Sequence, residues 1–313
     1  MLNRRHIRIK VMQTIYAVHQ HKSDDLIKEE KFLLHSMEAI QDLYLLLFSA
    51  LIELRKKEDI YLKVSSKKHL ATIEEKNPNK KFVQNQALLL LENQSSLSTA
   101  FQSRKINNWE LNDDLILMLL EEVKRSKMYM NYMQTSTSSF EDDAQFVHDL
   151  YEQVIAPNDR LYDYLEDNKL TWIDDYAIVN TLICKQLKKI NNLNYVIQIP
   201  KVYKDEDDKD FAKQLFLKTL LNEVELAKEY ANKTPNWDKD RIAEVDTILL
   251  KMAICELLKF PTIPVKVTIN EYLEIAKEYS TPKSSFFING ILDNLIKEYS
   301  STNKLHKAGR GLL

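Results

Sequence analysis

The stretch VDTILLKMAICELLKFPTIPVKVTINEYLEIAKEYSTPKSSFFINGILDNLIKEY, residues 245–299, decides the fold because three helical patterns follow one another in it with short breaks. Apolar residues recur at helical spacing over Lys239–Phe260, Val265–Tyr279 and Ser284–Tyr299. Pro261 separates the first two patterns, and a proline directly after a threonine suits the first turn of the third. The carboxyl-terminal part of the chain is therefore expected to be a compact group of helices.

Helical patterns also account for most of the remaining chain. The first helix is expected from Asn3, a favourable N-cap residue, to about His21. Polar breaks are expected at Ser65–Lys81, Thr135–Ser139 and Thr234-Pro235-Asn236, and there is no internal repeat of fixed period. The other helices are expected over about 26–57, 82–104, 113–133, 140–167 with an interruption at Pro157, 172–190 and 205–230, with a short extended stretch at Val196–Tyr203.

Glycine is scarce, with three residues in the whole chain, Gly290, Gly309 and Gly311. Sheet hairpins use glycine in their turns, and loops that hold nucleotides need it where the backbone approaches a phosphate. The composition therefore predicts an all-α fold without a Rossmann or P-loop site. The histidines are scattered and the acidic pairs lie in solvated charge runs, so we expect neither an enzyme, a metal site nor a bound cofactor.

The two cysteines and the lack of long apolar runs indicate a cytoplasmic protein. Cys184 and Cys255 lie in apolar helical patterns without metal-ligand partners nearby, which is typical of buried thiols in a reducing compartment. The basic amino terminus is not followed by the apolar segment of a secretory signal, and no run of about 18 uncharged apolar residues predicts a membrane span.

Basic residues gather at both ends of a chain whose formal net charge is −2. Residues 301–313 are expected to be a basic, flexible tail. Arg4 and Arg8 are one helical turn apart, and the start of a helix adds unpaired N–H groups and a partial positive charge. These features suit phosphate groups, although a solvated helix end is the alternative interpretation. The amino-terminal candidates for RNA binding are Arg4, Arg5, Arg8 and Lys10.

A second candidate site lies in residues 282–290. Lys283 is expected in the first turn of the last helix. Phe286 and Phe287 are displaced from each other by about 100° around the helix, so one ring can face the core while the other stacks on an unpaired base. Such stacking contributes about 1–3 kcal/mol, but the sequence does not decide which ring is exposed, and both could be core residues. Gly290 within a helix favours close packing of another helix over close approach of RNA.

Four segments of the chain resemble the NusB transcription-antitermination family. RRHIRIKVMQTIY (4–16) is similar to the arginine-rich first helix of that family, although His6 and Ile9 stand where arginine and an acid are common. VDTILLKMAICEL (245–257) and IPVKVTINE (263–271) resemble the two following family motifs, and FINGILD (287–293) resembles its ending, FvNGvLD.

The resemblance implies two small helical bundles that bind boxA, a single-stranded RNA element, together with the ribosomal protein NusE in the transcription elongation complex. We expect the two chain ends to fold together into one cationic surface. By position, the resemblance implies RNA contacts at Arg4, Arg5, Arg8, Lys283 and Phe287 and a partner-protein face at Tyr16 and Asp246.

The expected organisation is an all-α fold of NusB-like bundles with inserted helices. Residues 1–170 form an amino-terminal bundle with an insertion at about 60–135, residues 171–236 a helical insertion or connector, and residues 237–300 a carboxyl-terminal subdomain. A related methyltransferase is excluded because it would need a glycine-rich cofactor loop. A helical protein–protein adaptor with little or no RNA binding is the alternative function.

Overall fold

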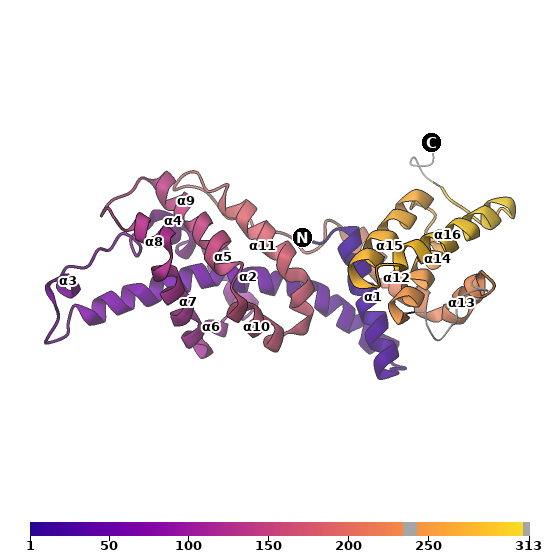
Figure 1. Ribbon diagram of the computed structural model, residues 1–313, viewed down its shortest axis with the longest axis horizontal. Coiled ribbons are helices and arrows are strands. Elements are labelled where there is room, and N and C mark those ends of the chain that lie inside the picture. The colour runs from indigo at the N-terminus through magenta and orange to yellow at the C-terminus, as the bar shows by residue number, and fades with distance from the viewer. Residues whose placement is uncertain (234–242, 309–313) are drawn as a thin grey trace. The chain divides into compact units, whose positions relative to one another are not determined.

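The structure is a computed structural model that describes residues 1–233 and 243–308. All regular elements in this part of the chain are helices, which confirms the all-α fold (Figure 1). The break expected at Thr234-Pro235-Asn236, the start of the helix expected from Lys239, and Arg310 in the tail lie outside the described residues. Among the residues described, no helix combines the length and the apolar character needed to cross a membrane.

The chain divides into two compact units. Unit 1 comprises residues 1–37 and 202–313, and unit 2 comprises residues 38–201. Helix α2 (Leu26–Ser65) begins in unit 1 and continues in unit 2. The sequence grouped residues 1–170 together, whereas the contacts join the first 37 residues to the carboxyl-terminal part of the chain.

Unit 1 is built around α1, which contacts α12, α14 and α15. The Asn3 side chain caps α1 by accepting a hydrogen bond from the backbone N–H of His6 at 3.0 Å. The buried face of α1 carries Ile7, Val11 and Ile15, which are at most 1% exposed. The helices of this unit are α1 (Arg4–His21), the first part of α2, α12 (Glu206–Leu221), α13 (Glu223–Ala231), α14 (Glu244–Lys259), α15 (Val265–Tyr279) and α16 (Ser284–Ser301).

Unit 2 packs shorter helices around the middle of α2. The leucines of α2 between residues 43 and 54 are fully buried, and two tryptophans donate hydrogen bonds to this helix through their indole N–H groups. Trp172 donates to the carbonyl of Ala39 and Trp109 to the hydroxyl of Ser49, both at 2.8 Å. The other helices are α3 (Ile73–Lys76), α4 (Gln86–Glu92), α5 (Ser95–Ser103), α6 (Asn108–Leu111), α7 (Asp113–Arg125), α8 (Lys127–Tyr132), α9 (Phe140–Leu150), the π-helix η1 (Tyr151–Ile155), α10 (Asp159–Asn168), the 3₁₀-helix η2 (Leu170–Trp172) and α11 (Ile173–Leu187).

Two segments outside the helices are bound to unit 1 by backbone hydrogen bonds. The stretch expected to be extended contains no strand, but the carbonyl of Val202 accepts from the backbone N–H of Leu2 at 3.0 Å. Near the other end, the backbone N–H of Ala308 donates to the carbonyl of Pro261 at 3.0 Å, and the side-chain ammonium of Lys307 donates to the carbonyl of Phe260 at 2.9 Å. The part of the expected flexible tail that the structure describes is therefore docked on the end of α14.

Candidate functional site

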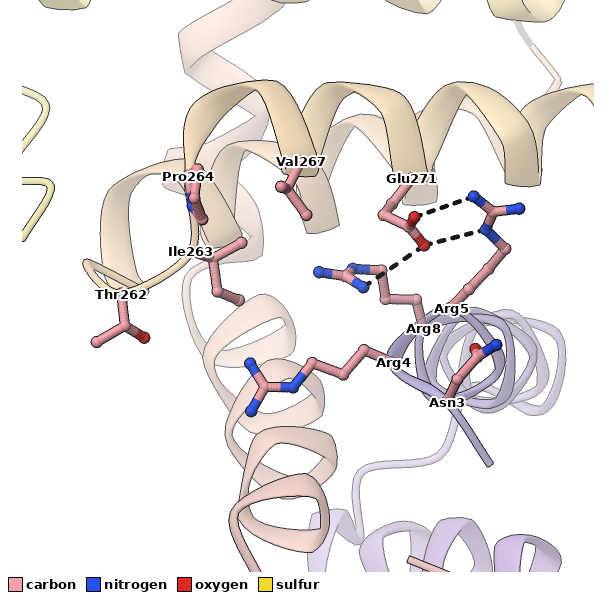
Figure 2. Close-up of a pocket in the computed structure, with 9 residues that line it drawn as sticks. All are labelled: Asn3, Arg4, Arg5, Arg8, Thr262, Ile263, Pro264, Val267 and Glu271. Carbon is pink, nitrogen blue, oxygen red and sulfur yellow. Dashed lines mark hydrogen bonds and ion pairs between the residues drawn. The ribbon is translucent and has the colours of Figure 1, made fainter. Parts of the chain in front are cut away.

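The amino-terminal turns of α1 contribute to a pocket of about 470 Å³ against α15. Figure 2 shows Glu271 of α15 lying between Arg5 and Arg8, while Arg4 extends toward Thr262. We call this site the arginine pocket. It is lined by Asn3, Arg4, Arg5, Arg8, Thr262, Ile263, Pro264, Val267 and Glu271.

Arg8 is buried, with 1% of its surface exposed. Its Nε and Nη2 atoms each donate to a carboxylate oxygen of Glu256 at 2.8 Å, and Thr268 donates to the same carboxylate at 2.7 Å. Burial lowers the pKa of Arg8, but the hydrogen bond and charge of Glu256 outweigh this effect and leave the pKa raised. Arg8 therefore connects α1 to α14 inside unit 1, and in this position it does not reach a ligand at the surface.

Arg5 and Arg4 are partly exposed, with side chains 38% and 44% accessible. Arg5 donates through Nε and Nη2 to both oxygens of Glu271 at 3.0 Å, and this hydrogen bond raises the pKa of Arg5. Arg4 donates through Nε to Asp208 at 3.1 Å and lies over the Phe211 ring. Its two terminal nitrogens form no hydrogen bond with any residue the structure describes, so these donors are available to an anion.

Lys10, the fourth basic candidate of α1, is buried with 3% of its surface exposed. His6, on the same helix, has a lowered pKa because burial and the charges of Arg5 and Lys10 disfavour its protonated form. The structure therefore leaves Arg4 and Arg5 as the accessible cations among the four amino-terminal candidates.

A second pocket, of about 630 Å³, lies along the first turns of α16. Lys283 is exposed at its edge as the N-cap residue of the helix. Phe286 is 79% exposed, whereas Phe287 is 8% exposed and faces the interior of unit 1. The structure thus answers the question that the sequence left open, because the accessible ring is Phe286. We call this site the α16 pocket; its lining residues are Lys233, Lys283, Phe286, Phe287, Gly290, Ile291 and Asn294.

Gly290 keeps the α16 pocket open. A Cβ atom built at this position would meet nothing within 4 Å. Close packing of another helix, the explanation favoured from the sequence, is therefore wrong for this glycine. A side chain here would project toward the space beside Phe286, so the glycine leaves that space free for a ligand.

The two residues expected on a partner-protein face differ in accessibility. Tyr16 is 41% exposed on α1. Asp246 is 5% exposed, and it accepts hydrogen bonds from the hydroxyl groups of Ser280 at 2.6 Å and Ser284 at 2.7 Å. Asp246 thus ties the start of α16 to the start of α14, and Tyr16 is the member of the pair that a partner can contact directly.

The arginine pocket and the α16 pocket both belong to unit 1, but they share no lining residue. Helix α15 contacts both α1 and α16. Arg5 lies in the electrostatic range of Glu271, Glu274 and Glu278, all on α15. The two chain ends thus fold into one unit, with acidic side chains of α15 beside the arginines rather than an uninterrupted run of cations.

Several lining residues were not expected from the sequence. Ile263, Pro264 and Val267 form the apolar wall of the arginine pocket, and Lys233 contributes a cation to the α16 pocket. The first three lie in the motif at residues 263–271, which resembles the family but was assigned no function from the sequence. That motif was the signal that could have indicated them. No local sequence signal indicates Lys233.

Among the described residues, one group of side chains has metal-ligand spacing. His148, Asp149 and Glu152 offer ligand atoms that lie within 4.8 Å of one another where α9 continues into η1. His148 Nδ1 is 3.2 Å from Asp149 and 4.0 Å from Glu152. Partly exposed acidic groups are common without a metal, so this cluster alone assigns no cofactor.

Comparison with known proteins matches the chain to one family. The sequence model of the NusB family matches residues 176–297. The chain is 40% identical to the transcription antitermination protein NusB of Salinibacter ruber over 121 residues, which are 39% of this chain and 75% of the relative. For the proteins of the same name, the identity is 43% over 112 residues in Chloroherpeton thalassium, covering 36% of this chain and 53% of the relative, and 39% over 93 residues in Finegoldia magna, covering 30% and 68%. No solved structure gives a significant match.

The family match begins at residue 176 and so covers most of residues 171–236, which were expected to be a helical insertion or connector. Helix α12 lies in this segment and contacts α1 and α14, and α13 contacts α14 and α16. Both helices therefore belong to the packed core of unit 1. The part of the chain outside the match includes α1 and most of unit 2.

Proposed function

The chain belongs to the NusB family, and we propose on this basis that it binds boxA-like single-stranded RNA together with the ribosomal protein NusE and modifies transcription elongation in the cytoplasm. The relatives are transcription antitermination proteins, and the family consists of transcription factors rather than enzymes. We therefore interpret the surface of this chain in terms of two partners, RNA and the transcription machinery.

The observation that carries the proposal is the exposed ring of Phe286 beside Lys283 and the open surface at Gly290. At 79% exposed, the Phe286 ring is accessible to a partner. A nucleic-acid base can stack on the ring, while the lysine ammonium neutralises the adjacent phosphate. The missing side chain at Gly290 leaves room for such a base.

The arginine pocket supplies the second part of the proposed RNA contact. Arg4 offers two terminal nitrogens that have no partner among the residues the structure describes, and Arg5 is partly exposed although it is paired with Glu271. Arg8, Lys10 and Phe287 are buried, so in this proposal they support the surface from within. Their contribution to RNA binding is then indirect, through the positions of α1 and α16.

The experiment is a fluorescence-anisotropy titration of a labelled boxA-like RNA with the full chain. Phe286→Ala is expected to weaken binding by the stacking energy of one base, about 1–3 kcal/mol. Lys283→Gln and Arg4→Gln are each expected to reduce the slope of log K against log salt by about 0.7, the value for one phosphate contact on a single strand. Phe32→Ala and Lys297→Gln are matched controls, because Phe32 is an exposed aromatic residue on α2 and Lys297 an exposed lysine later in α16.

A protein–protein adaptor is the alternative, and the same titration distinguishes it. An adaptor that docks through apolar surface shows little dependence of its affinity on salt, whereas RNA binding through phosphates shows a steep one. Addition of NusE should tighten RNA binding if the two proteins bind RNA together. Equal RNA affinity with and without NusE would contradict the joint binding, and the absence of any RNA affinity would contradict the proposed function.

A further inference from the structure

Unit 2 contains a lysine-lined hollow that the NusB family match does not include. It has a volume of about 240 Å³ and lies between the last turns of α2 and the segment that leads from α3 to α4. Lys63 comes from α2, Lys76 from the end of α3, and Lys80 from the following loop. We call this site the lysine hollow. All three lysines precede residue 176, where the family match begins.

The loop that carries Lys80 is held in place on both sides. The Asn79 side chain donates to the carbonyl of Met133 at 2.9 Å, and Lys81 donates to that of Tyr132 at 2.7 Å. The carbonyl of Lys80 itself accepts from the backbone N–H of Gln84 at 2.9 Å. Lys80 is exposed between Asn79 and Lys81, and the hydrogen bonds of these two residues fix its position in the wall of the hollow.

The charges of the lysine hollow are not balanced. Lys63 pairs at 2.6 Å with Asp59, the carboxylate that also lines the hollow. Lys76 and Lys80 are exposed and form no ion pair with any residue that the structure describes. Exposed Lys67, which follows the end of α2 and lies outside the lining of the hollow, also has no ion-pair partner among the described residues. The hollow is lined by the ammonium groups of Lys63, Lys76 and Lys80 and by the carboxylate of Asp59, so its net charge is positive.

We propose that the lysine hollow binds the phosphodiester backbone of RNA, as a second and sequence-independent contact in unit 2. This inference rests on the proposed function, because an RNA-binding chain is what makes a polyanion the partner of these lysines. Lysine ammonium groups act as point charges and suit phosphate without requiring the planar geometry of an arginine–carboxylate pair. Phosphate contacts position a nucleic acid without reading its bases, so RNA outside the boxA-like element is the expected ligand.

The test measures binding of labelled polyuridylate, which lacks the boxA-like element, to the full chain at about 50 to 200 mM salt. The variant Lys63→Gln/Lys76→Gln/Lys80→Gln should reduce the slope of log K against log salt by about 2, or 0.7 for each phosphate contact. Raising the salt concentration fourfold should therefore weaken RNA binding by the variant about 20-fold less than it weakens RNA binding by the wild type. The matched control is Lys185→Gln/Lys188→Gln/Lys189→Gln, which removes three exposed lysines from the end of α11 in the same unit.

A second variant tests the same site in the opposite direction. Asp59→Asn removes the carboxylate of the hollow, and it should tighten polyuridylate binding, which a purely structural role for Asp59 would not do. Circular dichroism and thermal unfolding are measured on every variant to confirm that it is folded. Competition with inorganic tripolyphosphate distinguishes a site for free phosphates, which it would saturate at low concentration, from one that requires a polymer.

The outcomes separate this inference from the proposed function. If the lysine variant binds polyuridylate like the wild type, or if the α11 control loses as much affinity, the lysine hollow is not an RNA site. Saturation of the hollow by tripolyphosphate without any polyuridylate binding also overturns the inference. In each of these cases, binding of the boxA-like RNA through Phe286 and Lys283 would still support the proposed function. If the wild type binds neither RNA, both proposals are wrong.

Discussion

The buried ion pair between Arg8 and Glu256 makes the arginine-rich start of the chain a structural element of unit 1. Glu256 is fully buried, and its carboxylate accepts from two nitrogens of Arg8, from Thr268 at 2.7 Å and from Tyr272 at 3.3 Å. Arg8→Ala would leave this carboxylate with its two hydroxyl donors and without its ion-pair partner. Breaking a buried pair by removing one partner costs about 3–5 kcal/mol. Because domains are stable by about 5–15 kcal/mol, this is a large share of the total.

The assay is urea unfolding followed by far-ultraviolet circular dichroism, combined with hydrogen exchange read by mass spectrometry. Arg8→Ala should lower the free energy of unfolding by about 3–5 kcal/mol and reduce protection in the peptides of α14 and α15. The matched control is Arg5→Ala, because the pair of Arg5 with Glu271 is partly exposed and such pairs contribute about 0–1 kcal/mol.

A double variant checks the reason for the loss. Arg8→Met/Glu256→Met removes both charges and should recover much of the stability lost in Arg8→Ala, because no uncompensated charge remains buried. Equal destabilisation by Arg8→Ala and Arg5→Ala would refute this reasoning. So would a double variant less stable than Arg8→Ala, since the cost could not then come from an isolated carboxylate.

Other residues of the chain give further expected outcomes. Phe287→Ala should lower the free energy of unfolding by about 3–5 kcal/mol, whereas Phe286→Ala should leave it almost unchanged, as urea titration of the two variants will measure. Asp246→Ala removes the acceptor of two hydroxyl groups at the start of α16, and thermal unfolding should reveal a loss of about 1–3 kcal/mol. Burial raises the pKa of the Cys255 thiol to about 11, so Ellman's reagent at neutral pH should modify Cys184 in the folded chain and Cys255 only after unfolding; equal rates would contradict the burial.

The positions of the carboxyl-terminal helices could be predicted from the sequence because local signals define them. The apolar spacing and the prolines indicated α14, α15 and α16 to within a few residues. Breaks without proline or glycine were harder to recognise. The helix expected at 205–230 is interrupted at Asn222, and the one expected at 113–133 is interrupted at Ser126. At Lys22 the chain leaves α1 with a φ of 50°, a conformation more common for glycine, so a scarcity of glycine did not prevent such an ending.

The composition of the candidate site could be predicted only in part, because the partners of its charges are distant in sequence. In the sequence, the first 22 residues contain basic side chains and no acidic one. In the fold, Arg4, Arg5 and Arg8 meet carboxylates that lie between 204 and 266 residues further along the chain. The adjacent phenylalanines posed a similar problem. Helical geometry allowed one ring to be exposed while the other is buried, but only the packing of α16 determines that the exposed ring is Phe286.

The three arginines of α1 hold the helix to three others, and this explains how one basic segment contributes both to the fold and to a ligand site. Arg4 pairs with α12 and Arg5 with α15, whereas Arg8 pairs with α14 and, at 3.8 Å from Glu271, also with α15. A guanidinium group has five N–H donors, and Arg4 uses one of them on its carboxylate. Its remaining donors can bind a phosphate without breaking the pair that holds α1 to α12. Exposure, rather than the number of arginines in the sequence, therefore determines which of these residues can contact RNA.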